Sequence, residues 1–487
     1  MRVTLSGGRA PGQLSAGKAV GCLVLFPLPF AAVGIGTGAM AVRAALARDW
    51  GQAGFLAIFA LTFGGLGIGG MVAVLRGRGK LAEQESLEAR NPDQPWLWRA
   101  DWAAGRIDDS NRKTMVGAWL FAVFWNLVSI PAGVVGVRES VEKGNHVGLI
   151  ALLFPVIGIG LLTWAIRNTA RHRKFGVSRF ELATRPGVIG HALAGTVRTS
   201  VTLLPPEGFK LTLSGIRRVT SGSRDDRSTT ETVLFQDERR ARGDGRSIPV
   251  VFPLPADAGP CDRSDPDNAV LWRLEVSADV PGIDYAASFE VPVFRTADSE
   301  KPRTAGEEAA LKDPQAPAVY QQPAESPITV TSTLRGTEIF FPAARNPGAA
   351  LGLTAFLLIW SGGIWASIHF GAPMIFPIVF GLFWVLLFFG ALELWLGVSR
   401  VTADRDGVTI ATGYLAPLRE RIVSAPEIGE VTTRIGMQSG RTPYYDVILV
   451  RKIGRPVTVA RGMRDKREAE WIAEALERAV GVVKSGK

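Results

Sequence analysis

Two long apolar runs, residues 349–370 and 374–396, dominate the pattern of apolar and polar positions in the C-terminal third of the chain. Each run is close to the ~20 residues that a helix needs to cross a bilayer. Only Gly371, Ala372 and Pro373 separate them. Because so short a connection must turn the chain back, the pattern predicts a transmembrane helical hairpin whose two ends lie on the same side of a membrane.

Four further apolar runs precede this hairpin, at about 20–42, 54–75, 115–137 and 147–166. A secretory signal is the alternative for the first run, since Arg2, Arg9 and Lys18 come before it. That run exceeds the roughly 7–15 apolar residues of a signal peptide, and a second run follows closely, so a retained helix is predicted. Residues 1–174 therefore form a four-helix transmembrane region, in which residues 76–113 are a tryptophan-rich polar loop.

The distribution of lysine and arginine orients these six predicted helices. With the N-terminus inside, the short outer segments carry four basic residues, and the N-terminal segment with residues 76–113 carries eleven. A basic collar also follows the fourth helix, at Arg167, Arg171, Arg173 and Lys174. Both termini are therefore expected in the cytoplasm, with anionic lipid beside the basic collars.

Over residues 175–296 the sequence consists of short runs in which apolar and polar residues alternate. These runs are separated by clusters of Pro, Gly, Asp and Ser. Trp272, Leu274 and Val276 alternate with polar neighbours, as in a half-buried strand. About seven such runs predict an antiparallel β-sandwich. The segment LWRLEVSADVPGIDYAASFEVPVF, residues 271–294, resembles a strand pair of immunoglobulin-like and arrestin-like sandwiches. This resemblance implies a fold and no activity.

Residues 297–326 are rich in Pro, Ala, Glu, Lys and Gln and are predicted to be a flexible linker. A β-hairpin and lead-in follow at 327–348, and residues 397–487 contain several strand-like runs before an amphipathic helix. That element order resembles bacterial pleckstrin-homology-like domains, which implies lipid or protein binding. Residues 327–341 and 398–412 have similar patterns on either side of the 349–396 hairpin. We therefore expect both to belong to one small α+β domain.

Candidate chemistry is sparse in this sequence. The four histidines lack a second His or Cys at ligand spacing, so no metal site is expected. No phosphate-binding loop or serine-hydrolase motif occurs, and neither a catalytic residue nor a cofactor is predicted. The net charge of +10 could indicate nucleic acid, but the basic residues gather beside the apolar runs, which favours anionic lipid. The two cysteines, Cys22 and Cys261, cannot form a disulfide framework.

Two groups of residues are candidate sites. The first is the segment NPDQPWLWRADWAAGRI, residues 91–107, whose aromatic and basic side chains suit either anchoring at lipid headgroups or docking onto a soluble domain or a partner. Its candidate residues are Trp96, Trp98, Arg99, Trp102 and Arg106. The second comprises polar groups within the apolar runs, Asn126 and Glu393. Intramembrane polar groups are candidates for function, although interhelical hydrogen bonding also explains Asn126.

The same tryptophan segment, together with the FPAARNPG turn and the VPGIDY strand pair, is similar to uncharacterised bacterial multi-pass membrane proteins that contain a domain of unknown function. The fold class expected is a mixed membrane protein: six transmembrane helices, a cytoplasmic antiparallel β-sandwich and a small α+β C-terminal domain. The expected function is a non-catalytic scaffold or binding module in the bacterial inner membrane that presents its β domains to a protein partner. A transporter or channel component is the alternative.

Overall fold

The computed structural model describes residues 27–143, 151–221, 228–265, 267–312, 322, 326–333, 336–369, 371, 373–417, 419–440 and 442–481. The chain forms two compact units. Unit 1 comprises Met1–Thr230 and Leu234–Gln315, and unit 2 comprises Glu231–Val233 and Ala316–Lys487. Among the described residues, six helices are long and apolar enough to cross a membrane, four in unit 1 and two in unit 2.

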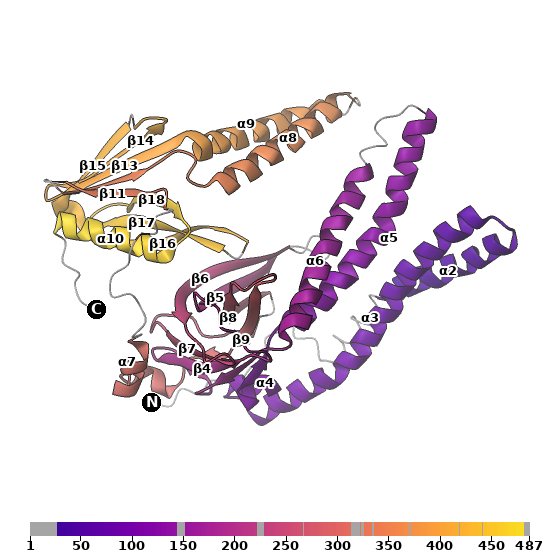
Figure 1. The fold of residues 1–487 in the computed structure, drawn as a ribbon, viewed down its shortest axis with the longest axis horizontal. Helices are drawn as coiled ribbons and strands as arrows, with labels where there is room; N and C mark the ends of the chain where they lie inside the picture. The colour runs from indigo at the N-terminus through magenta and orange to yellow at the C-terminus, as the bar shows by residue number, and fades with distance from the viewer. Residues whose placement is uncertain are drawn as a thin grey trace, which may run out of the picture. The chain divides into compact units, whose positions relative to one another are not determined.

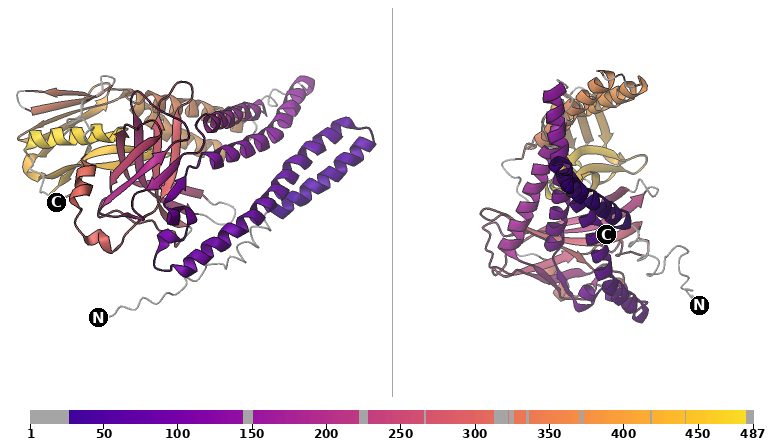
Figure 2. Two further views of the ribbon diagram at one scale, coloured as in Figure 1. Left: turned by 60° about the horizontal axis from the view of Figure 1, so that its bottom comes forward. Right: turned by 90° about the vertical axis from the view of Figure 1, so that its right-hand side faces the viewer.

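The first two long helices of unit 1 form an antiparallel hairpin, α2 (Pro27–Leu46) and α3 (Trp50–Arg90). Small residues let their backbones meet, because a Cβ added at Gly67 would lie 2.2 Å from the backbone nitrogen of Ala31. Figure 2 shows α3 continuing as one helix beyond the end of α2. Residues 76–90 are therefore helical and not part of a loop, since the polar sequence continues the helix without a proline or a capping residue before Asn91. The predicted start of the first run, residues 20–26, lies outside the described residues.

A second helical pair consists of α5 (Asn111–Lys143) and α6 (Leu153–Phe175). Asn126 of α5 is buried and donates hydrogen bonds from Nδ2 to the carbonyl oxygens of Ala122 and Gly158, at 2.8 and 3.1 Å. A Cβ at Gly158 would lie 2.4 Å from Asn126 Oδ1, so only glycine allows this contact between the helices without a shift. The amide of Asn126 thus joins α5 to α6.

Two four-stranded antiparallel sheets of unit 1 share one hydrophobic core and form a β-sandwich. One sheet has the order β1-β2-β4-β7, with bounds Arg106–Asp108, Arg179–Leu182, Ala192–Arg198 and Ser247–Pro253. The other has the order β6-β5-β8-β9, with bounds Ser228–Ala241, Phe209–Ser221, Asn268–Ala278 and Tyr285–Val291. A parallel pair, β3 (Gly187–Val188) with β10 (Val293–Phe294), lies beside them. As the alternating pattern predicts, Trp272, Leu274 and Val276 are buried in the core.

The sandwich extends beyond residues 175–296 at both ends. At its N-terminal side, β1 pairs with β2, so residues from the predicted loop complete a sheet. At its C-terminal side, a 3₁₀ turn (Ala297–Glu300) and α7 (Ala305–Leu311) follow β10, where a flexible linker was predicted. Both Glu307 carboxylate oxygens lie 3.2 Å from Nδ1 of the buried His191, which attaches α7 to the sandwich. Amino-acid composition did not predict these two short helices, because each one is started locally by a capping box, at Thr296 and at Thr304.

Unit 2 contains two antiparallel sheets and a C-terminal helix around one core. The five-stranded sheet has the order β11-β12-β13-β14-β15, with bounds Thr329–Ser332, Gly336–Phe341, Gly397–Asp404, Gly407–Tyr414 and Arg419–Ser424. The three-stranded sheet consists of β16 (Ile428–Ser439), β17 (Thr442–Arg451) and β18 (Val457–Met463), and α10 (Lys466–Val480) packs against it (Figure 1). Ala469, Ile472 and Leu476 of α10 are buried in this core.

The two long helices of unit 2, α8 (Pro347–His369) and α9 (Ile375–Leu396), lie between adjacent strands of the five-stranded sheet. β12 pairs antiparallel with β13, in a register that puts Phe341 opposite Ser399 and Ile339 opposite Val401. The strands before and after the helical hairpin therefore belong to one sheet. This pairing fixes the bases of α8 and α9 beside each other at one edge of the domain.

Candidate functional site

Trp102 lies in the core of the sandwich. It belongs to the short helix α4 (Ala100–Ala104), and only 3% of its surface is exposed. Its indole Nε1 donates to the carbonyl oxygen of Glu290 at 3.0 Å, and its ring centroid is 6.0 Å from that of Phe294. Gly105 then adopts a left-handed conformation with φ 68° and turns the chain into β1. Trp102 is consequently a core residue of this domain, and its ring is not available for the headgroup contact considered above.

Arg99 holds the same segment to the sandwich through charge. Its guanidinium donates to Asp101 Oδ2 at 2.6 Å and to Glu290 Oε1 at 2.9 Å, and its Cζ lies 4.3 Å from the centroid of the Trp102 ring. Burial lowers the pKa of Arg99, but the hydrogen bond to Asp101 and the attraction of Glu290 outweigh it and raise that pKa. Arg263 also contacts Glu290, and its Cζ lies 5.7 Å from the centroid of the Trp102 ring.

The other three candidates in this segment have weaker roles in the sandwich. Trp96 is partly buried, with its ring centroid 5.7 Å from that of Phe294. The indole of Trp98 donates to the carbonyl oxygen of Asn91 at 2.7 Å, which closes the turn after α3. Arg106 is exposed on β1 and stands opposite Glu181. The structure thus brings Trp96, Arg99 and Trp102 together against the sandwich.

The ends of α5 and α6 are joined to the sandwich by hydrogen bonds. Asn111, the first residue of α5, donates from Nδ2 to the carbonyl oxygen of Ala286 at 2.7 Å. Lys174, near the end of α6, donates to the carbonyl oxygens of Pro281 and Ile283 at 2.7 and 3.1 Å. The buried Asp109 accepts from the backbone N–H of Ser178 at 2.9 Å, and burial raises the pKa of its carboxyl group. One residue of the predicted collar, Lys174, thus binds protein at this junction, and Arg171 does so too, through the carbonyl oxygen of Asp284.

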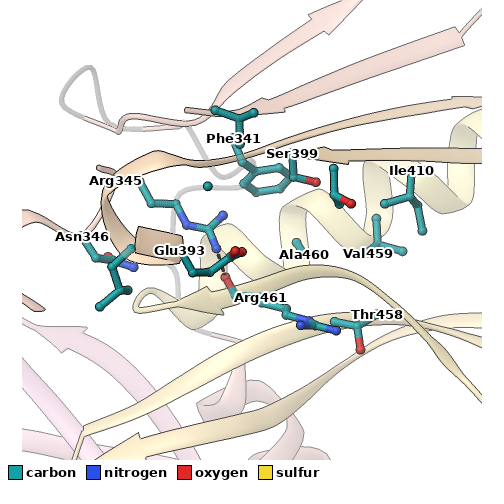
Figure 3. Close-up of a pocket in the computed structure, with 14 residues that line it drawn as sticks. Phe341, Arg345, Asn346, Glu393, Ser399, Ile410, Thr458, Val459, Ala460 and Arg461 are labelled. Atoms are coloured by element: carbon teal, nitrogen blue, oxygen red, sulfur yellow. Dashed lines mark hydrogen bonds between the residues drawn. The ribbon is translucent and has the colours of Figure 1, made fainter. Parts of the chain in front are cut away.

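A cavity of about 270 Å³ lies in unit 2 where α8 and α9 meet the sheets (Figure 3). Its wall combines the turn before α8, the end of α9, strands β13 and β14, and strand β18. The polar residues of this wall are Arg345, Asn346, Glu393, Ser399, Thr412, Thr458 and Arg461. Glu393, which the sequence identified as a candidate, is therefore a wall residue of a cavity, whereas Asn126 belongs to a helix contact in unit 1.

Arg345 is one of two arginines in the wall of this cavity, and Arg461 is the other. Arg345 follows Ala344, which adopts a left-handed φ of 53°, and this turn directs the guanidinium toward β18. Its Nη2 donates to the carbonyl oxygen of Arg461 at 2.7 Å, and its Cζ lies 5.3 Å from the Phe341 ring centroid. Desolvation lowers the pKa of Arg345, and the attraction of Glu393 and Asp446 opposes that shift. A partly desolvated guanidinium with one acceptor keeps most of its five N–H donors for another group.

Two further polar residues of the wall, Glu393 and Ser399, differ in the exposure of their side chains. Glu393 is exposed, and the charge of its carboxylate acts on Arg345. The hydroxyl of Ser399 is inaccessible to solvent and has no hydrogen-bond partner among the described atoms. Gly397 lies beside the carboxylate, since a Cβ there would be 3.1 Å from Glu393 Oε1. The amino-acid sequence alone did not identify Arg345 or Ser399. The signal it contains for Arg345 is a charged residue just before one apolar run, with a second charged residue, Glu393, near the end of the next run.

No protein-family model matches this chain, and no curated protein sequence matches it. Among solved structures, the chain has a likeness to Spo0M, a sporulation control protein from Bacillus subtilis. The two share 11% sequence identity, and the match covers 49% of this chain and 78% of that one, with a TM-score of 0.18. A similarity at this level does not bear on the function of this chain.

Proposed function

We propose that this protein is a multi-pass membrane protein whose six long helices cross a bacterial inner membrane. The support is physical. Between 6% and 28% of the residues in each candidate span are buried within the chain, and large side chains such as Leu358, Ile359 and Leu382 are about 70% exposed, at 69%, 72% and 69%. Continuous apolar surface over helices of this length is stable in lipid and not in water.

The proposed orientation puts both termini and both β units in the cytoplasm. The number of crossings before each β unit is even, and the basic residues beside the helices are concentrated in the segments on that side. Anionic lipid is the proposed partner for those basic residues that do not bind protein.

Within this frame we propose a non-catalytic scaffold, which holds its β units at the membrane surface for a protein partner. The observation that carries this proposal is the junction between α5, α6 and the sandwich. Strand β1 lies between α4 and α5, and residues at two helix ends donate hydrogen bonds to sandwich carbonyls. Such a joint fixes a binding surface relative to the bilayer, which a flexible tether would not do.

The edge strand β15 offers a defined place to test for a partner. In the described part of its sheet, β15 pairs only with β14, so its other edge has backbone groups that an added strand could use. Ile422 on this strand is 71% exposed, and Ile453, in the turn after β17, is 88% exposed and serves as a matched control.

The experiment introduces a photo-reactive amino acid at position 422 or at position 453 of the full chain in native membranes. A scaffold predicts a discrete adduct of constant mass from position 422 and none of that mass from position 453. Equal, diffuse labelling from both positions would contradict binding at this edge. Substrate flux across vesicles that contain the purified protein would instead favour a transporter.

A further inference from the structure

The turn between β14 and β15 lies at the base of the α8–α9 hairpin. β13 follows α9 directly, and its first residue, Gly397, pairs with Tyr414, the last residue of β14. The backbone N–H of Leu415 then donates to the carbonyl oxygen of Leu396, the last residue of α9, at 2.8 Å. This 414–417 turn is therefore held at the end of a candidate membrane span within one compact unit.

The backbone of the 414–417 turn is strained at Leu415. This residue has a φ of 61°, and the backbone N–H of Ala416 donates to the carbonyl oxygen of Tyr414 at 2.7 Å. A γ-turn with a positive φ is rare and strained, and glycine adopts a positive φ without the steric cost that leucine has. Such strain persists where the surrounding structure fixes it, here through the β13–β14 pairing and the hydrogen bond to the end of α9.

The strained turn presents apolar side chains to its surroundings. Tyr414 is 51% exposed and Leu415 is 72% exposed, and Ala416 beside them is exposed as well. Neither Tyr414 nor Leu415 belongs to the hydrophobic core of the described part of unit 2. Single exposed apolar residues are common on protein surfaces, but a leucine at a position that suits glycine gains nothing there in water. An apolar environment outside the protein would give this side chain a role.

The depth of the turn follows from the length of α9. Its 22 residues span about 33 Å, close to the ~30 Å thickness of the hydrocarbon core of a bilayer. If α9 crosses the membrane, as proposed above, its last residue, Leu396, lies at the boundary between acyl chains and headgroups. The hydrogen-bonded Leu415 then lies at the same level. Trp395 near the end of α9 and Tyr414 in the turn are of the aromatic types that are enriched at this boundary.

Basic side chains follow the turn along β15. Arg419, the first residue of β15, is exposed and stands opposite Thr412, and Arg421 two residues further along is also exposed. An apolar tip followed by exposed arginines is typical of a segment in a membrane interface. The apolar side chains then contact acyl chains, and the guanidinium groups lie at the level of the phosphates.

We propose that the 414–417 turn is a membrane contact of unit 2, in which Tyr414 and Leu415 enter the lipid bilayer beside α9. The contact continues the apolar surface of α9, on which Leu386 is 65% exposed and Phe389 is 57% exposed. It gives the five-stranded sheet an attachment to the bilayer in addition to α8 and α9. The orientation of the sheet relative to the membrane is then fixed at three places instead of two. This inference rests on the proposed membrane arrangement and adds a lipid-binding surface to it.

The test measures the depth of position 415 in nanodiscs that contain the purified full chain. Leu415→Cys, Leu358→Cys and Ile453→Cys are made separately in a chain without Cys22 and Cys261, and each is labelled with bimane. Leu358, in the middle of α8, is 69% exposed and serves as the membrane reference. Ile453 is 88% exposed and precedes β18, whose other end contacts the base of α8, so it serves as the aqueous reference. The quenchers are lipids with a nitroxide at carbon 5 or carbon 14 of the acyl chain.

A contact about 5–10 Å deep in the interface predicts that the carbon-5 nitroxide quenches position 415 about twofold or more better than the carbon-14 nitroxide does. Position 358 should show the reverse order, and position 453 should not be quenched. Absence of nitroxide quenching at position 415 would overturn the proposal. If that position were at the same time shielded from iodide in the aqueous phase, a protein partner would cover the turn instead of lipid.

A second label keeps Leu415 in place. Bimane at Ala416→Cys should show the same preference for the carbon-5 nitroxide, and adding Leu415→Asp should remove at least half of this quenching. Adding Ile453→Asp, the matched change at an exposed aliphatic residue far from the turn, should leave it unchanged. Full quenching in the Leu415→Asp chain would overturn the insertion of this side chain.

The inference and the proposed membrane arrangement fail differently. Quenching at position 358 without quenching at position 415 contradicts only the membrane contact of the turn. Absence of quenching at position 358 contradicts the crossing of the bilayer by α8, and the proposed contact of the turn is then wrong as well.

Discussion

Replacing Trp102 by alanine tests whether the tryptophan segment is part of the sandwich. The change removes a ring that is 97% buried, judged from its 3% exposure, and deletes the hydrogen bond to Glu290. Truncation of a core tryptophan costs roughly 3–5 kcal/mol, of which every ~1.4 kcal/mol is a factor of ten. The opening equilibrium of the sandwich should therefore increase between about one hundred and several thousand fold.

Cys261 supplies the assay, because its thiol is buried in the same core. Burial raises the pKa of Cys261 to about 11, so the thiol reacts with a maleimide essentially only after the domain opens. Cys22 is first replaced by alanine in the full chain, so that the labelling rate reports Cys261 alone. When closing is faster than labelling, the rate is proportional to the opening equilibrium constant.

Trp98→Ala is the matched control for this experiment. Trp98 lies four residues away in the same segment and closes a local turn through Asn91, but it does not belong to the sandwich core. Its replacement should change the labelling rate less than tenfold. Unchanged protection of Cys261 in Trp102→Ala would refute the docking of this segment and favour anchoring at the membrane surface.

Two further perturbations test other parts of the fold. Gly158→Leu should lower the unfolding temperature of the detergent-solubilised protein more than Asn126→Ala does. The leucine forces α5 and α6 apart, whereas the alanine removes hydrogen bonds worth only ~0.6–2 kcal/mol. A larger effect of Asn126→Ala would contradict this packing. The backbone N–H of Thr304, together with His191, lowers the pKa of the Glu307 carboxyl group from 4.5 to about 2. The charged form of Glu307 therefore stabilises the docked α7 above pH 4.5, and this contribution is lost as the pH falls toward 2. Hydrogen exchange in residues 305–311, corrected for its intrinsic pH dependence, should show this loss, and Glu307→Gln should remove the pH dependence.

The sequence predicts the elements whose pattern is strong and local. The six apolar helices, the alternating strand at Trp272 and the amphipathic C-terminal helix all follow from periodicity over many residues. The similar patterns on either side of the 349–396 hairpin indicated a shared domain, and β12 and β13 are indeed adjacent strands. These features follow from patterns within one segment, or from two similar patterns that flank one hairpin.

Features that depend on distant partners could not be predicted in the same way. The burial of Trp102 requires Glu290 and Phe294, which are more than 180 residues away along the chain. The attachment of α7 requires His191, and the cavity requires a turn before α8 to meet a strand near the C-terminus. A composition rich in Pro, Ala and Glu therefore indicated a linker where tertiary contacts order part of the segment.

The most direct test of the proposed membrane arrangement is cysteine accessibility in intact cells. Single cysteines are placed in a chain without Cys22 and Cys261, at Arg48 in the α2–α3 turn, Pro373 in the α8–α9 turn, Leu204 in unit 1 and Ile453 in unit 2. An impermeant maleimide should label positions 48 and 373 in intact cells, and positions 204 and 453 only after the membrane is permeabilised. Labelling of position 204 or 453 in intact cells would contradict six crossings that leave both β units in the cytoplasm.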